Sequence, residues 1–130
     1  MRRSGEAPQV PQQVQLTGLS ALEHGQALTF DYERRGESEQ GFVLRHNDGY
    51  VAYRNWCPHW GVDLDMGGGR FYAPKVDRIY CRNHGALFRP KDGFCDAGPC
   101  AMAHLEAFEI EVDGDAATVT IADIDPRLLG

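Results

Sequence analysis

Apolar and polar residues alternate along this chain in short segments that are separated by turn residues. In the segment 108–112 (FEIEV), three apolar residues alternate with two glutamates. A period of two indicates a β-strand with one buried face. The Asp113-Gly114 step that follows is a hairpin signal, so we expect the segment 118–121 (TVTI) to be the partner strand.

Five further segments mix aromatic and β-branched residues with polar ones, and we expect strands at 27–33, 41–46, 50–55, 77–81 and 86–90. The second and third of these meet at a turn whose Asp48-Gly49 step is typical of a hairpin. No segment shows sustained helical periodicity, and residues 18–26 form at most one helical turn. Short strands in this arrangement predict an antiparallel all-β domain, either a sandwich or a small barrel.

The chain of 130 residues has the length of one domain. Residues 1–13 are rich in Gln and Pro, so we expect a disordered N-terminal tail followed by one folded domain over residues 14–125. Arg2-Arg3 is reminiscent of a twin-arginine export signal, but the apolar stretch that such a signal requires does not follow. We therefore expect a cytoplasmic protein.

The formal net charge is −6, and the basic residues are scattered along the chain. A nucleic-acid-binding surface needs a basic face, and a membrane span needs about 18 consecutive apolar residues. We expect a monomer that binds neither nucleic acid nor membranes and that meets its partners through an acidic surface. In the cytoplasm, four cysteines are expected to bind a metal or to be free rather than to form disulfides.

Two short segments each contain one cysteine and one histidine. Cys57 and His59 lie in NWCPHWG, and Cys81 and His84 lie in YCRNHGALF. Thiolate and imidazole are ligands of zinc and of iron–sulfur clusters. A zinc ion takes all four side chains in a tetrahedron. A [2Fe–2S] cluster takes both cysteines on one iron and both histidines on the other.

The order of the ligands distinguishes these two centres. Common zinc fingers group cysteine with cysteine and histidine with histidine, whereas here each segment has a cysteine followed by a histidine. The two segments, together with the later Gly98-Pro99, resemble the cluster-binding loops and the proline loop of Rieske [2Fe–2S] domains. The resemblance covers residues 14–121 and implies a Rieske-like antiparallel sandwich or small barrel with a two-loop cluster-binding subdomain.

The resemblance also implies the ligands of one [2Fe–2S] cluster per chain. Cys57 and Cys81 would bind the buried iron as thiolates, and His59 and His84 would bind the outer iron with their ring edges near solvent. Between His59 and Cys81 lie 21 residues, which is more than is usual in the family. We expect the surplus in the glycine-rich segment 65–77, as a surface loop that tolerates insertion.

The resemblance further indicates the kind of Rieske protein. High-potential members carry a disulfide between the two loops, at positions where this chain has Val62 and Asn83. They also direct hydroxyl groups at the cluster sulfurs from positions that are Ala86 and Phe88 here. Because hydrogen bonds to the sulfurs raise the potential, we expect a potential nearer to roughly −150 mV than to roughly +300 mV.

The function that the resemblance implies is that of a ferredoxin, which carries single electrons and is not an enzyme. It implies a flavin-dependent NAD(P)H reductase as the donor and a terminal oxygenase or reductase as the acceptor. Rieske oxygenases have a second iron site in a long C-terminal domain, which we do not expect in 130 residues. Two alternatives are a Rieske-like small subunit of a larger reductase, such as nitrite reductase, and a structural zinc or interaction module.

The remaining cysteines, histidines and nearby acids have simpler interpretations. Cys95 and Cys100 either form a redox-active pair or disulfide, or pack as half-buried thiols, and a reducing compartment favours packing. We interpret three histidines as ordinary surface residues: His24, His46 and His104. Three aspartates near the loops could steer a basic partner or could simply be solvated: Asp63, Asp65 and Asp96.

Overall fold

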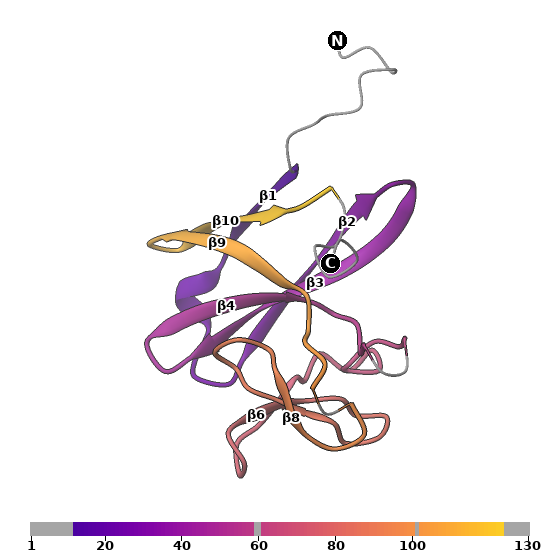
Figure 1. Ribbon diagram of the computed structural model, residues 1–130. Helices are drawn as coiled ribbons and strands as arrows, with labels where there is room; N and C mark the ends of the chain where they lie inside the picture. Colours follow the sequence, from indigo (N-terminus) through magenta and orange to yellow (C-terminus); the bar gives the residue numbers. More distant parts are fainter. Residues whose placement is uncertain (1–11, 59–60, 101, 124–130) are drawn as a thin grey trace.

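The structure is a computed structural model that describes residues 12–58, 61–100 and 102–123. Six strands form one sheet in the order β1-β10-β9-β4-β3-β2: β1 (Gln12–Thr17), β2 (Ala27–Arg34), β3 (Glu37–His46), β4 (Gly49–Arg54), β9 (Ala107–Asp113) and β10 (Ala116–Ile121). Four short strands form a smaller sheet in the order β5-β6-β7-β8: β5 (Tyr72–Ala73), β6 (Arg78–Tyr80), β7 (Leu87–Phe88) and β8 (Cys95–Ala97). The smaller sheet lies below β3 and β4 in Figure 1.

This architecture confirms the expected all-β domain. All strand pairs are antiparallel, and the helical part of the described residues is the short 3₁₀ helix η1 (Leu19–Ala21). No helix in the described ranges is long and apolar enough to cross a membrane. Strand β1 begins at Gln12, two residues before the expected start of the domain, while residues 1–11 of the expected tail lie outside the described residues.

The larger sheet curls until its two edge strands meet. The side-chain amide of Gln12 on β1 donates to the carbonyl of Glu33 on β2 at 2.6 Å. The expected β3–β4 hairpin is confirmed, with His46 paired to Gly49. The β2–β3 turn was not expected: Arg35 and Gly36 have φ values of 53° and 81°, the left-handed conformations of a tight hairpin turn.

Strand β3 separates two hydrophobic cores. Phe42 and Leu44 pack into the core shared with the smaller sheet, whereas Val43 packs inside the larger sheet, and all three are fully buried. The ring of Phe42 stacks on Phe71, which precedes β5, with centroids 3.9 Å apart and planes at 11°. A strand that is buried on both faces does not alternate, which explains the unbroken apolar run in β3. The smaller sheet is therefore held against β3 by aromatic packing.

A buried ion pair joins the end of β2 to the residue before β9. The two terminal guanidinium nitrogens of Arg34, Nη1 and Nη2, donate to the carboxylate of Glu106 at 2.8 and 2.7 Å, and Nη2 also donates to Glu39 at 2.8 Å. Arg34 is 6% exposed and Glu106 is 2% exposed. The hydrogen bond with Glu106 is the main reason that the pKa of Arg34 is raised above its ordinary value. The pair fixes the end of β2, next to the turn at Gly36, to the segment that leads into β9.

We expect Arg34→Met to destabilise the protein by about 3–5 kcal/mol, because it leaves the Glu106 carboxylate buried without its cation. The neighbouring Arg35 is a matched control, since its ion pair with Asp123 is more than half exposed on both sides. Arg35→Met should cost about 0–1 kcal/mol. Urea unfolding followed by far-UV circular dichroism measures both values. Equal losses in the two variants would show that the buried pair has no special role.

Candidate metal centre

The two Cys/His segments form loops with the same backbone hydrogen bonds. In each loop, the cysteine N–H donates to the carbonyl five residues later, and the N–H four residues later donates to the cysteine carbonyl. The two distances are 2.7 and 2.8 Å for the loop of Cys57, and both are 2.9 Å for the loop of Cys81. Gly61 and Gly85 occupy the fourth position after their cysteines with φ values of 68° and 77°, where glycine is favoured. The loops are structural equivalents, although their histidines differ in spacing.

The two loops bring the cysteine side chains together. Cys57 and Cys81 are both 0% exposed and belong to the same core. Burial raises the pKa of the Cys81 thiol, and its hydrogen bond with the Cys57 thiol raises it further, while backbone N–H groups of Asn83 and His84 act in the opposite direction. Two adjacent buried thiols ionise together only when a cation compensates their charge. The pair is therefore suited to bind a metal centre as thiolates.

The histidines are expected on the outer side of the centre. His84 is exposed and lies three residues after the buried Cys81. His59 lies outside the described residues, so the structure describes three of the four expected ligands. Sulfur donors on the protein side and an imidazole on the solvent side fit a cluster with one buried and one outer iron.

The expected proline loop lies against the second ligand loop. Gly98 has a φ of 92°, and a Cβ atom built on it would lie 2.8 Å from the Cα of Ala86 and 3.1 Å from the carbonyl of Gly85. This backbone contact excludes any larger residue at position 98. Pro99, the next residue, is exposed.

The family model for the Rieske [2Fe-2S] domain matches residues 13–112. The chain belongs to this family. Its cofactor is therefore a Rieske-type [2Fe–2S] cluster, as the sequence predicted. No curated protein matches the sequence significantly.

Solved structures agree with this assignment. The ferredoxin of carbazole 1,9a-dioxygenase from Nocardioides aromaticivorans IC177 is 27% identical, with a TM-score of 0.61, over 85% of this chain and 97% of that one. A ferredoxin–oxygenase complex of carbazole 1,9a-dioxygenase contains a chain that is 25% identical, with a TM-score of 0.64, over 87% and 94% of the two chains. Another such complex contains a longer chain that is 16% identical, with a TM-score of 0.69, over 89% of this chain and 30% of that one. This likeness shows the fold alone. The first two neighbours support a Rieske ferredoxin, an electron-transfer component.

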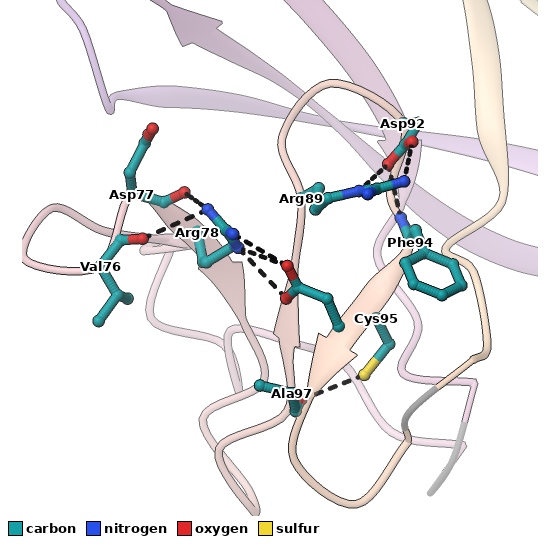
Figure 2. A network of polar contacts seen from close by, with 9 residues as sticks. Val76, Asp77, Arg78, Arg89, Asp92, Phe94, Cys95 and Ala97 are labelled. Carbon is teal, nitrogen blue, oxygen red and sulfur yellow. Dashed lines mark hydrogen bonds and ion pairs between the residues drawn. The ribbon is translucent and has the colours of Figure 1, made fainter.

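Cys95 and Cys100 lie in the Rieske domain as free, buried thiols. Cys95 donates its S–H to the carbonyl of Ala97 at 3.3 Å, as Figure 2 shows. Burial, together with a hydrogen bond to Cys95, raises the pKa of Cys100. A buried thiol with a raised pKa is a poor nucleophile. The structure therefore agrees with the packing interpretation.

The aspartates near the loops have different environments. Asp96 on β8 pairs with Arg78 on β6 at 2.9 Å, across the intervening strand β7. Arg89 pairs with Asp92 in the turn between β7 and β8. Asp65 is buried, whereas Asp63 is exposed. Of the three aspartates that could steer a basic partner, two are thus already engaged within the domain.

Two histidines that we interpret as ordinary surface residues connect the two sheets. His24 Nε2 lies 3.1 Å from the hydroxyl of Tyr72, and His46 Nε2 lies 2.8 Å from a carboxylate oxygen of Asp77. Tyr72 also donates a hydrogen bond to Asp77. The contacts join residues 48 and 31 positions apart in the chain, and no local pattern in the sequence indicates them. This part of the interpretation was therefore incomplete.

Proposed function

We propose that this Rieske domain is a low-potential ferredoxin whose cluster is bound by Cys57, His59, Cys81 and His84. The observation that carries the proposal is the pair of equivalent loops that place two buried sulfurs together, with an imidazole at the surface. When bound, the cluster accepts and releases one electron. Cys57 and Cys81 would hold the inner iron in the buried core, and His59 and His84 would hold the outer iron.

The exposed position of His84 supports its role at the site of electron transfer. A partner can approach this imidazole without rearrangement of the core, because the loop from Arg82 to Gly85 is exposed. We infer that a flavin-dependent NAD(P)H reductase reduces the protein and that a terminal oxygenase oxidises it. The similar ferredoxin from Nocardioides aromaticivorans, which belongs to carbazole 1,9a-dioxygenase, supports the oxygenase as acceptor.

The residues around the second loop support a low potential. Ala86 and Phe88 are 1% and 0% exposed, and neither side chain has a hydrogen-bond donor. Fewer donors to the sulfurs leave the additional electron of the reduced cluster less stabilised. This is the potential range in which a carrier can accept electrons from NAD(P)H through a flavin.

An EPR spectrum recorded before and after dithionite reduction tests the cluster. We expect a signal only after reduction, with the low average g value of a histidine-ligated [2Fe–2S] centre. Cys81→Ala should abolish this signal, because it removes a thiolate ligand, whereas Cys95→Ala should retain it as the buried-thiol control. An EPR-silent protein that contains zinc would contradict the electron carrier.

A hydroxyl group at position 86 should raise the reduction potential. We expect Ala86→Ser to do so by about 40 mV, which corresponds to one hydrogen bond of about 1 kcal/mol for a one-electron couple. Ala97→Ser is the control, because Ala97 is exposed on β8 and its change should leave the potential unaltered. Spectroelectrochemical titration measures both variants. A lower potential in Ala86→Ser would contradict the explanation from missing donors.

A mobile carrier should not copurify with a fixed partner. We expect the tagged chain, isolated from its own cells at native expression, to elute from size-exclusion chromatography as a monomer, because a shuttle must dissociate from each partner. A second protein at constant stoichiometry through the column would instead identify the chain as a subunit of a larger reductase. Mass spectrometry of the eluted fractions distinguishes the two results.

A further inference from the structure

Two buried polar side chains lie beside the ligand loops without being ligands themselves. Asn55 is 2% exposed and Asp65 is 3% exposed. Asn55 lies two residues before Cys57, and Asp65 lies shortly after the end of the first loop at Val62. Buried polar groups cost free energy unless they are hydrogen-bonded. The bonds that Asn55 and Asp65 make indicate what they do.

The side-chain amide of Asn55 connects β3 to the segment that follows the first loop. Its Nδ2 donates to the side-chain oxygen of Gln40 at 2.7 Å and to Oδ1 of Asp65 at 3.0 Å. Its Oδ1 accepts the backbone N–H of Leu64 at 2.8 Å. Both amide hydrogens and the oxygen are therefore engaged, and the direction of the segment after the loop is defined relative to the sheet.

The carboxylate of Asp65 is held by donors alone. Besides Asn55, the backbone N–H groups of Gly67 and Gly69 donate to it at 3.1 and 2.9 Å. Burial acts to raise the pKa of Asp65, but the hydrogen bonds from Asn55 and the two glycines outweigh it and hold the pKa below the ordinary value. Asp65 therefore stays charged and fixes the beginning of the glycine-rich segment.

The backbone of Leu64 connects Asn55 to the second ligand loop. Its N–H is bound by Asn55, and its carbonyl accepts the N–H of Arg82 at 2.9 Å. Arg82 directly follows Cys81. A continuous hydrogen-bonded path thus leads from the residue before the first loop to the second ligand loop. No disulfide joins the two loops, so hydrogen bonds and packing hold them together in addition to the proposed cluster.

We propose that Asn55 and Asp65 are positioning residues that hold the two ligand loops at the separation the cluster requires. This inference rests on the proposed ligands Cys57 and Cys81. Without the Asn55 amide, the buried N–H of Leu64 loses its acceptor. Leu64 can then move, which weakens the hydrogen bond between its carbonyl and the N–H of Arg82. The loops then separate more easily, which exposes the sulfur ligands and releases iron.

Two substitutions test the proposal: Asp65→Asn, which keeps the shape of the side chain but removes one acceptor, and Asn55→Ser, which removes the amide. We expect each to shorten the half-life of the cluster in the presence of EDTA by about 10-fold, the lower end of the effect of losing partners around a metal site, because these bonds act on the ligand loops through Leu64. The EPR g values of the reduced cluster should also shift. Visible absorption and EPR spectra follow the cluster, and far-UV circular dichroism follows the fold.

Asp92→Asn is the matched control. Asp92 accepts the N–H of Phe94 at 3.1 Å in another turn of the smaller sheet, in a pattern like that of Asp65 with Gly67. The control should keep the half-life and g values of the wild type. A third variant, Asp65→Ala, removes all the acceptors of this side chain. Its cluster should have a shorter half-life than that of Asp65→Asn.

The outcomes separate this proposal from the proposed function. A wild-type protein without a Rieske EPR signal would overturn the ligand assignment itself. A wild-type protein with the signal, but variants that match Asp92→Asn in half-life and g values, would overturn the positioning role. Cluster loss that coincides with unfolding of the larger sheet in both variants would assign Asn55 and Asp65 to general stability and would also overturn it.

Discussion

The stack of Phe42 on Phe71 is the contact on which the metal centre depends. The strands of the smaller sheet are two or three residues long, and such strands do not form an independently stable sheet. They are stable here because β3 contributes Phe42 and Leu44 to the core in which Phe71, Ile79 and Phe88 are buried. The ligand loops connect elements of this shared core. Their rigidity therefore comes from the larger sheet.

The equivalent loops influence the ionisation of the cysteine ligands as well as their position. Burial raises the pKa of the Cys81 thiol, so this side chain is a better thiolate ligand when a cation is bound beside it. The backbone N–H groups that face the sulfur of Cys81 partly offset this cost. Burial on one side and exposure of His84 on the other give the site a protected interior and an accessible edge. Such asymmetry suits an electron carrier, which must shield its cluster and still approach a partner closely.

Local patterns predicted most of the fold. The alternation in 108–112 and the Asp-Gly steps identified strands and hairpins that the structure contains. Strand β5, in contrast, falls inside the segment expected to be a surface loop, because two residues are too few to show a period. The turn at Arg35-Gly36 has a glycine in the left-handed conformation, and a glycine between two strand-like segments is a turn signal in the sequence.

The sequence predicts the part of the site that consists of cysteine and histidine ligands. Cysteine and histidine at these spacings have few other uses, so the loops were recognisable. Asn55, Asp65 and the ion pair of Arg34 with Glu106 have no such signature, because each depends on burial and on partners distant in the chain. An Asp followed by glycines does indicate a turn that its carboxylate can close, as Asp65 does with Gly67 and Gly69. Nothing local indicates that this carboxylate is also bound to Asn55.

The net charge of −6 is distributed unevenly along the chain. Residues 55–105, which contain the ligand loops, include six of the 13 basic residues but five of the 19 acidic ones. Several of these acids are already paired, as Asp92 and Asp96 are with arginines. The acidic excess therefore lies in the other segments, most of which form the larger sheet. Because the excess of negative charge lies in those segments, a partner with an acidic surface would meet less long-range repulsion at the ligand loops than at the larger sheet.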